Sequence, residues 1–419
     1  MCYNTKGISG NSRKLSILVQ KMNGVKMNCN YFDFDTAPER KNTGSMKYHW
    51  LPEGWAEDGI LTFSGAELDL KTAPCISEAL ARRAQNGLYG YTLPDDAYLD
   101  SLRNWLRTER EWEISNDWIV PTYGIIQALN CCIRAFTKPG DAVLIQPPTY
   151  HMYAKAALKN ERRVVENPLI YKNGYYEMDF EDLEKKMSGP EVKLMVLCNP
   201  QNPIMDFWGE EELKKLAALA DKYHVVVFSD EIFAEHSYAG TVPAYGKFDE
   251  RHSIVLTSLG KAFNFTGFSH GNAVIRDEAL RSAFIEQRDR DHFGSIDPFI
   301  YAAQIAAYSP EGKEWLQEML AYSWENAGLL RKFFADYFPE VICCRQRGGT
   351  LVWVDLHSFG MEEEVLHTFL QKEARFQSDK GSIYGTGGEC FTRIEVGTPR
   401  KNLEQALDRL LAAAKKRGL

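Results

Sequence analysis

The sequence predicts an α/β protein in which a mostly parallel sheet is sandwiched by helices and is followed by a smaller α+β domain. From about Thr72 onward, short apolar runs alternate with amphipathic helical patterns, as they do in parallel βαβ units. After Asp277 the pattern is mainly helical to about Phe338, and the last 80 residues mix short strands with helices. A chain of 419 residues also exceeds one ordinary core, which favours two domains.

The elements of the first domain follow one another with short breaks. Apolar residues recur at helical spacing from Ile125 to Phe136, the breaker Lys138-Pro-Gly-Asp141 follows, and the apolar run 142–146 then predicts a buried strand. Runs that are apolar throughout are typical of central parallel strands. Further elements are expected at 193–198 (strand), 210–224 (helix), 225–229 (strand) and 253–258 (strand).

We expect four segments along the chain. Residues 1–26 are polar without periodicity and are expected to form a flexible extension, and residues 27–70 are expected to pack with the small domain. Residues 71–310 form the predicted large domain and residues 311–419 the small α+β domain, with strands near 350–356 and 391–396. The boundary is placed inside the helical stretch because no Pro/Gly/Ser-rich linker interrupts it.

Composition excludes several classes of function. Lys and Arg number 49 against 57 Asp and Glu, and the resulting charge of −8 provides no basic field for nucleic acid or anionic membrane. The only N-terminal apolar run, 15–19, is too short for a signal peptide, and no stretch approaches a membrane span. The nine cysteines include no C-x-x-C, and the histidines show no metal-ligand spacing. We therefore expect a reduced, cytoplasmic protein without a bound metal.

Polar residues cluster where the predicted strands end. Ligands of open parallel sheets lie outside the carboxyl ends of the strands, so these residues are the first candidates for a site. Together they supply an amide, a carboxylate, an amine and a helix N-terminus. The segments are Asn199-Pro-Gln-Asn-Pro203, Ser229-Asp-Glu231, Ser258-Leu-Gly-Lys261 and, before a helix, Pro121-Thr-Tyr-Gly124.

Those groups are the ones that pyridoxal 5′-phosphate requires. The cofactor needs a lysine amine for its aldehyde and a carboxylate that keeps its ring nitrogen protonated. Lys261 and Asp230 are the candidates for these two tasks, and Asn202 can donate to the phenolate oxygen of the ring.

The remaining cofactor contacts are predicted at two places. The phosphate is expected at the start of the helix that begins after Gly124, where free N–H groups and the helix dipole favour negative charge. Tyr123, Gly124 and Ile125 form this start, and Ser258 adds a hydroxyl. Tyr150, which follows the strand at 142–146, is placed to stack on the ring face.

The order of these motifs resembles fold type I pyridoxal phosphate enzymes of the class I and II aminotransferase group. Several longer segments resemble more narrowly the cystathionine β-lyase and cystalysin subgroup of carbon–sulfur lyases, and the similarity runs from about Tyr31 to the end of the chain. The matching segments are Phe32-Asp-Phe-Asp35, Arg40-Lys-Asn-Thr-Gly-Ser-Met-Lys47, Tyr89-Gly-Tyr-Thr92, Ala135-Phe-Thr-Lys-Pro-Gly-Asp141, Glu177-Met-Asp-Phe-Glu-Asp-Leu183 and Lys261-Ala-Phe-Asn264.

The resemblance implies roles for individual residues. Lys261 matches the lysine that joins the cofactor, and Asp230, Asn202 and Tyr150 match the partners of the ring nitrogen, the phenolate and the ring face. Tyr91 matches a tyrosine that reaches the phosphate of the neighbouring subunit, which implies a homodimer with shared active sites. Arg393 matches the arginine that binds the substrate α-carboxylate, and its planar fork suits that task.

The chain departs from the subgroup at several positions. Pro203-Ile-Met-Asp206 stands where Pro-Thr-Gly-Arg is usual, so Met205 takes the place of a glycine that a positive φ favours. Ser64–Leu70 lacks the tryptophan of the corresponding segment, which indicates a differently shaped substrate pocket. The other replacements are Gly260 for serine, Tyr123 for proline and Phe233 for a polar residue.

The leading hypothesis is a pyridoxal phosphate enzyme that cleaves the Cβ–S bond of an L-cysteine S-conjugate by β-elimination to a thiol, pyruvate and ammonia. Lys261 serves as the base that removes the α-proton, because burial beside a cationic ring lowers the pKa of an amine. An aminotransferase acting on an L-amino acid uses the same residues and is the first alternative. A non-catalytic protein that keeps the fold for binding or regulation is the second.

Overall fold

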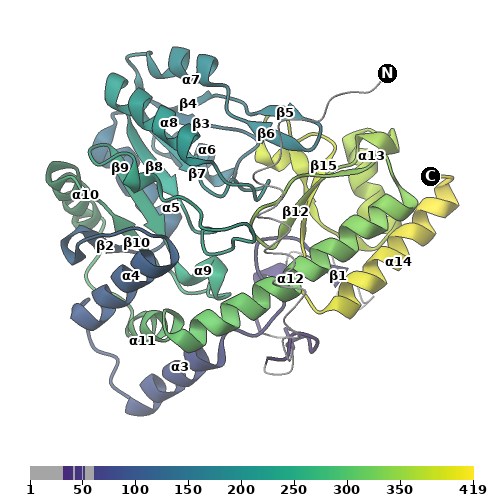
Figure 1. Ribbon diagram of the computed structural model, residues 1–419, viewed down its shortest axis with the longest axis horizontal. Helices are drawn as coiled ribbons and strands as arrows, with labels where there is room; N and C mark the ends of the chain where they lie inside the picture. The colour runs from purple at the N-terminus through teal and green to yellow at the C-terminus, as the bar shows by residue number, and fades with distance from the viewer. Residues whose placement is uncertain (1–31, 41–42, 50, 52–60) are drawn as a thin grey trace, which may run out of the picture.

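The computed structural model describes residues 32–40, 43–49, 51 and 61–419, and these residues form two main sheets with separate hydrophobic cores and two short two-stranded sheets. The larger, mostly parallel sheet lies on the left of Figure 1 and the smaller sheet on the right. This architecture is the predicted one: helices flank a mostly parallel sheet, and a smaller α+β unit follows. The predicted extension at 1–26 lies outside the described residues.

The large sheet has the strand order β2-β10-β9-β8-β7-β3-β4. Its strands from β9 to β4 are parallel, whereas β10 runs antiparallel to both β9 and β2 at the other edge. The strands are β2 (Ile119–Thr122), β3 (Ala142–Ile145), β4 (Arg163–Glu166), β7 (Val192–Cys198), β8 (Val226–Asp230), β9 (Ser253–Thr257) and β10 (Gly271–Val274).

Helices cover both faces of this sheet, and the alternation of side chains along each strand explains why. Leu194 and Val196 of β7 pack into the core under α5, α6 and α10, whereas Met195 and Leu197 face the opposite core under α4, α7 and α8. The helices are α4 (Asp96–Glu109), α5 (Ile125–Phe136), α6 (Met152–Lys159), α7 (Phe180–Met187), α8 (Glu210–Tyr223) and α10 (Glu278–Arg290).

The region after Asp277 is helical to Tyr337, close to the predicted Phe338, but two breaks that were not predicted interrupt it. It is divided into α10, α11 (Pro298–Ala307) and α12 (Pro310–Tyr337). Asp297 and Ser309 cap the last two helices, and each cap is followed by a proline at the first helical position, so the sequence does carry a break within 300–325.

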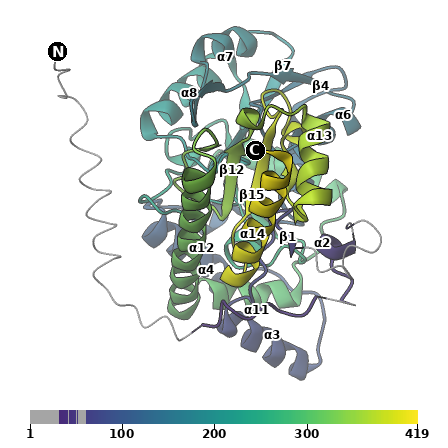
Figure 2. The same ribbon diagram turned by 90° about the vertical axis from the view of Figure 1, so that its right-hand side faces the viewer.

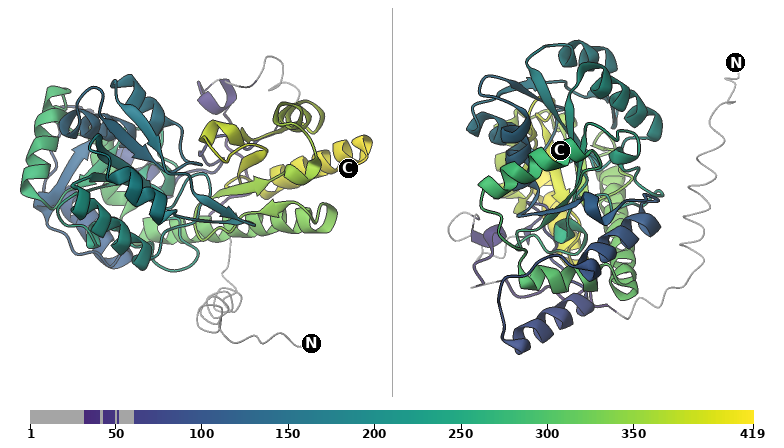
Figure 3. Two further views of the ribbon diagram at one scale, coloured as in Figure 1. Left: turned by 90° about the horizontal axis from the view of Figure 1, so that it is seen from above. Right: turned by 90° about the vertical axis from the view of Figure 1, so that its left-hand side faces the viewer.

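The long helix α12 belongs to both cores. Trp315 and Met319 pack with the large-domain residues, and Leu330 and Phe334 pack beneath the small sheet. Seen from above in Figure 3, the two parts lie side by side and α12 extends from one to the other. Because the chain passes between the domains without a linker, the position of the boundary at 310/311 stays a prediction.

The small sheet is antiparallel, with the order β11-β12-β15-β14. Helices α12 and α14 (Arg400–Arg417) lie side by side against it in Figure 2. Asn326 of α12 donates from Nδ2 to the carbonyls of Val396 and Thr398 and so fixes the end of β15. The other elements here are β11 (Ile342–Cys343), β12 (Leu351–Asp355), α13 (Glu363–Thr368), a π-helical turn (Phe369–Glu373), β14 (Asp379–Lys380) and β15 (Phe391–Glu395).

Part of the N-terminal region packs against the small domain. Strand β1 (Leu61–Thr62) pairs in parallel with β13 (Phe376–Gln377), and Phe63 stacks on Phe376. In the described part of the chain, no helix is long and apolar enough to cross a membrane. The remaining elements are α2 (Met46–His49), α3 (Pro74–Asn86), β5 (Ile170–Lys172), β6 (Tyr175–Glu177) and α9 (Leu259–Ala262).

Candidate active site

Lys261 lies on α9, the short helix that follows β9. The Ser258 hydroxyl caps this helix by accepting a hydrogen bond from the Gly260 N–H at 3.1 Å, which fixes the direction in which Lys261 leaves it. Nζ of Lys261 donates to the Ala66 carbonyl at 2.6 Å. Burial, together with the charge of Arg393, lowers the pKa of Lys261 to about 8. The amine is therefore much easier to deprotonate than a surface lysine.

Asp230 ends β8 and is buried beneath the same region. Its Oδ2 accepts a hydrogen bond from the Tyr153 hydroxyl at 2.6 Å, and Oδ1 accepts one from the Ile232 N–H at 3.2 Å. Burial raises the pKa of Asp230 to about 6. Among the described residues the carboxylate has no cation within ion-pair distance. A cationic group bound above it would remove the cost of burying its charge.

Arg393 of β15 reaches from the small domain to Asn202 of the large domain. Its Nη1 donates to Asn202 Oδ1 at 2.8 Å, and its Nε and Nη2 lie 3.1 and 2.5 Å from Asp379 Oδ2. These contacts use three of its five N–H groups and leave one N–H on each terminal nitrogen. Two such N–H groups can bind a carboxylate with two hydrogen bonds. Asn202 is held with its Nδ2 as the remaining donor.

The start of α5 forms an anion-binding position at the other end of the site. Gly124 caps the helix with φ at 105°, a conformation that side chains rarely adopt, and its carbonyl accepts the Ala128 N–H at 3.0 Å. The N–H groups of Ile125 and Ile126 precede the first intrahelical donor and are available to a ligand. The position of the phosphate here stays a prediction.

Ser258 is brought beside this position, but its hydroxyl proton is already used. The Oγ of Ser258 donates to the His270 carbonyl at 2.7 Å, and the His270 backbone also lies against Gly124. In this arrangement the Ser258 hydroxyl can accept a hydrogen bond from a ligand but cannot donate one. Its predicted donation to a phosphate therefore requires a rotation of the hydroxyl.

The three predicted aromatic residues differ in their placement. Tyr150 is half-buried, and its ring meets that of Tyr153 edge-on at 5.6 Å, close to the charges of Arg393 and Asp230. Tyr91, in contrast, is 99% exposed, so it contributes nothing to the site of its own chain. Tyr123 is also exposed and packs on Phe293 with 4.5 Å between ring centroids.

The segment 64–70, which lacks the usual tryptophan, closes over the site. Gly65 N–H and the Ser64 hydroxyl donate to Asp379, and the Ala66 carbonyl holds Lys261. Asn264 anchors the segment by accepting from the Leu68 N–H and donating to the Leu68 and Leu70 carbonyls. One short stretch therefore contacts both Lys261 and Asp379, the partner of Arg393.

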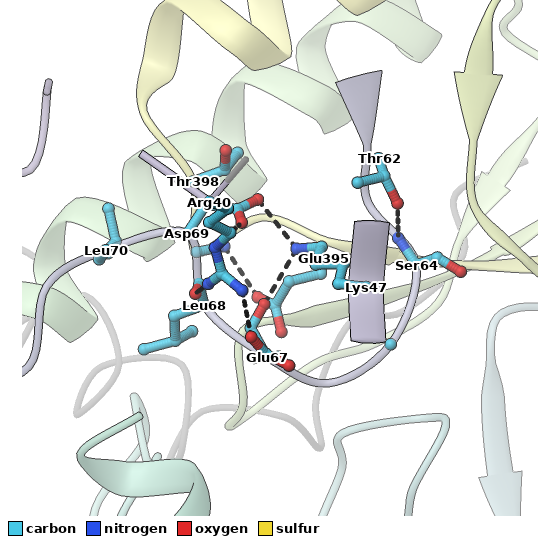
Figure 4. Close-up of polar contacts among 12 residues, drawn as sticks. Arg40, Lys47, Thr62, Ser64, Glu67, Leu68, Asp69, Leu70, Glu395 and Thr398 are labelled. Atoms are coloured by element: carbon cyan, nitrogen blue, oxygen red, sulfur yellow. Dashed lines mark hydrogen bonds and ion pairs between the residues drawn. The ribbon is translucent and has the colours of Figure 1, made fainter. Parts of the chain in front are cut away.

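A cluster of charged side chains holds the 64–70 segment in place (Figure 4). Lys47 Nζ lies 2.9 Å from Asp69 Oδ2 and 3.1 Å from the Glu67 carbonyl, and Arg40 pairs with both Glu67 and Asp69. Arg40 and Lys47 are the ends of one of the motifs that carry the family resemblance. Their observed task is to position the 64–70 segment.

Met205 adopts the left-handed conformation that the replaced glycine suggested. Its φ is 58°, its side chain is fully buried against Phe233 and Leu351, and its carbonyl accepts the N–H groups of Arg347 and Gly348. A positive φ costs a non-glycine residue about 1 kcal/mol. Packing of the thioether side chain offsets this strain, so the loop that carries Asn202 keeps its shape.

Sequence reasoning missed several residues of the site. Tyr153 lies one helical turn after Tyr150, and Asp379 pairs directly across from Arg393 on β14, so both could be found once the elements around them were known. Glu395 lies two residues beyond Arg393 on the same face of β15. His236 gave no signal in the sequence, because it lies in a loop that only the tertiary fold brings to Lys261.

Comparison with known proteins identifies similar chains over almost the whole length. Residues 59–410 match the family described as aminotransferase class I and II. Cystathionine beta-lyase PatB of Bacillus subtilis (strain 168) is 33% identical over 385 residues, which cover 91% of this chain and 99% of that protein. Protein MalY of Escherichia coli (strain K12) is 28% identical over 386 residues, covering 91% and 98%.

Solved structures give the same picture. Cystalysin from Treponema denticola, which contains a pyridoxal 5′-phosphate cofactor, has a TM-score of 0.86 and 30% identity, covering 92% of this chain and 99% of that one. The pyridoxal-phosphate-bound C-S lyase from Staphylococcus hominis has a TM-score of 0.84 and 27% identity, covering 91% and 98%.

Proposed function

The chain belongs to the aminotransferase class I and II family, and from that premise we propose that it is a pyridoxal-phosphate-dependent carbon–sulfur lyase acting on L-cysteine S-conjugates. The relatives named as cystathionine β-lyase and C-S lyase support this activity over transamination. The structural observation that carries the proposal is that Asp230 and Arg393, both buried, lie close enough to Lys261 for their charges to act on its amine.

The residues present fit the cofactor. Asp230 is a buried carboxylate that lacks a cation, and a protonated ring nitrogen supplies one. The α5 N-terminus at Gly124 suits the phosphate, Asn202 Nδ2 suits the phenolate oxygen, and Tyr150 suits the ring face. When bound, pyridoxal phosphate supplies an aldehyde that takes up the substrate amine and a cationic ring that draws electrons from the Cα–H bond.

The protein's own groups orient the substrate and move its proton. The two unused N–H groups of Arg393 hold the α-carboxylate, which orients the substrate toward Lys261. Nζ of Lys261, whose pKa is lowered to about 8, removes the α-proton. Asp230, held by the Tyr153 hydroxyl, keeps the proton on the ring nitrogen.

Loss of the α-proton allows the Cβ–S bond to break. The sulfur leaves with the bonding electron pair and takes up a proton to become the thiol. Addition of water to the remaining three-carbon unit gives pyruvate and ammonia, so one conjugate and one water yield one thiol, one pyruvate and one ammonia. Burial of Asp230 and Arg393 limits the access of other water until this stage.

We also propose that the enzyme acts as a homodimer in the cytoplasm. Four large side chains of the 88–93 loop are exposed, with Leu88 at 71%, Tyr89 at 58%, Tyr91 at 99% and Leu93 at 70%. Such a patch favours a partner surface, and a second copy would bring Tyr91 to the phosphate of its neighbour. The free cysteines of the described residues suit a reducing compartment.

Product analysis tests the activity. The purified protein, supplied with pyridoxal phosphate and a cysteine conjugate such as cystathionine, should release pyruvate and thiol in equal amounts without any keto-acid acceptor. Strict dependence of turnover on an added keto acid would instead establish an aminotransferase. Cofactor binding without turnover of any amino acid would establish a non-catalytic protein.

A further inference from the structure

A narrow crevice on the side of Lys261 that faces the 64–70 segment contains two buried titratable groups to which the proposed mechanism gives no task. Glu395 and His236, each 1% exposed, line it together with Lys261, Gly260 and Thr350. The crevice has no room for a water molecule, so these groups act on one another without a solvent intermediary. Gly260 contributes no side chain at the point where the subgroup has a serine.

Glu395 is directed at the site by the geometry of β15. Residues two apart on a strand point to the same face, so Glu395 lies on the same face as Arg393. Its Oε1 accepts the Gly397 N–H at 2.8 Å, which holds the carboxylate in place. Burial raises the pKa of Glu395, and the nearby Lys47 and Thr350 only partly offset this effect.

The charged side chains next to Glu395 neutralise one another without its contribution. Arg40 and Lys47 are two cations, Glu67 and Asp69 are two carboxylates, and these four groups pair among themselves (Figure 4). Glu395 adds a fifth charge to the cluster. Among the described residues it forms no ion pair, so no cation lies within ion-pair distance of its carboxylate.

Lys261 is the cation that lies in position to balance the charge of Glu395. The charged groups that face Lys261 are Arg393 and Glu395 of β15, Glu67 of the 64–70 segment and Asp230 of β8. Of the three carboxylates, Glu67 is paired with Arg40 and Asp230 is the expected partner of the cofactor ring, which leaves Glu395. His236 is neutral here, because burial lowers its pKa to about 4.

We propose that Glu395 is the counter-ion of protonated Lys261 and thereby sets the pH range over which this lysine exchanges its proton. Its carboxylate stabilises the charged nitrogen whenever Lys261 has taken up a proton, including the α-proton of a substrate. Glu395 is a positioning residue, since it acts through Lys261 and does not touch the substrate. The inference rests on the proposed function only for the role of Lys261.

The visible absorbance of the cofactor-loaded enzyme tests this, because the band reports whether the nitrogen of Lys261 bound to the cofactor carries a proton. In Glu395→Gln, which keeps an oxygen for the Gly397 N–H, the midpoint of a pH titration of this band should fall by about 1 unit. Glu395→Asp keeps the charge and should restore most of the midpoint. The matched control is Glu67→Gln, which removes a carboxylate that already has a cation and should shift the midpoint by less than half as much.

An unmoved or raised midpoint in Glu395→Gln, or an equal shift in Glu67→Gln, would overturn the inference. If Glu395→Gln does not bind the cofactor, the cofactor-free full-length protein supplies a second midpoint, that of the free Lys261 amine, on which Glu395 should act in the same direction. A brief pulse of acetic anhydride at a series of pH values, followed by mass spectrometry of the Lys261 peptide, measures the lysine midpoint directly, and an unmoved midpoint there would likewise overturn it. A missing visible band in wild type contradicts the proposed function instead, so the two failures are distinguishable.

Discussion

Asp379 binds the edge of the Arg393 guanidinium that carries Nε and Nη2. The two residues pair directly across strands β14 and β15, and Asp379 Oδ2 lies 2.5 Å from Nη2 and 3.1 Å from Nε of Arg393. Asp379 is in turn fixed by the Ser64 hydroxyl at 2.6 Å and by the Gly65 N–H. Although burial raises the pKa of Asp379, Arg393 and these donors lower it below its usual value, so the pair stays ionised.

Arg393→Lys should therefore weaken substrate binding selectively. A lysine cannot bond Asp379, Asn202 and a carboxylate in one plane, so we expect KM to rise by at least about 10-fold, because bidentate charged pairs are worth roughly 1.5–3 kcal/mol. Cofactor binding, measured by the visible band, should be retained. Arg345→Lys is the control, since this arginine pairs with Asp206 and is 52% exposed. Equal KM values in the two variants would contradict the role of Arg393.

Tyr153→Phe tests how Asp230 is held. Removing the 2.6 Å hydrogen bond to the carboxylate should raise the pKa of Asp230 further and weaken its pairing with the cofactor ring. We expect the Kd for pyridoxal phosphate to rise by about 10-fold, as for loss of one hydrogen bond to a charged group. Titration with the cofactor, followed by protein fluorescence, measures it. Tyr301→Phe, which removes an exposed hydroxyl from Asp95, should leave the Kd unchanged.

The pH dependence of turnover should reflect the depressed pKa of Lys261. The neutral amine is the proton acceptor, and burial lowers its pKa from 10.5 to about 8. We therefore expect kcat for thiol release to rise with pH and to level off above a midpoint near 8. Initial rates between pH 6 and 10, with the substrate saturating at each pH, provide the measurement. A midpoint at the ordinary lysine value would show that Lys261 is not the limiting base.

The buried His236 predicts a loss of stability in acid. Burial lowers its pKa from 6.5 to about 4, so between these values the unfolded chain binds a proton that the folded chain does not. This contribution to the free energy of unfolding is complete above pH 6.5 and is lost as the pH falls to 4, by about 3 kcal/mol. In His236→Leu, the free energy of unfolding measured with urea should depend less steeply on pH over this window. At pH 7 to 8 its pH dependence should equal that of wild type. An unchanged slope would show that His236 binds its proton equally well in the folded and the unfolded chain.

The sequence anticipated the central strands because burial on both faces produces continuous apolar runs. The predicted strands at 142–146, 193–198, 225–229 and 253–258 differ from β3, β7, β8 and β9 by no more than one residue at either end. Strand β2 was not predicted, because it is four residues long, contains Pro121 and lies at the sheet edge where a proline is tolerated. The breaks before Pro298 and Pro310 were also missed, since the apolar pattern continues through them.

The site residues that lie at the ends of strands could be predicted from the sequence. Asn202, Asp230 and Lys261 lie there. In the structure Asn202 contacts Arg393, whose charge, like that of Asp230, acts on Lys261. Asp379 and Glu395 could not be assigned from the sequence, because their tasks depend on which strand pairs with β15 and on which domain the pair faces. Long-range contacts of this kind leave no local pattern.

The covalent attachment of the cofactor to Lys261 is the claim on which the account depends. Loaded wild-type protein should show a visible absorbance band that borohydride abolishes, and mass spectrometry of the digested protein should then find the cofactor fixed to the peptide that contains Lys261. In Lys261→Ala the band and the modified peptide should both be absent. A wild-type protein that binds pyridoxal phosphate but yields no modified Lys261 peptide after reduction would contradict the assignment.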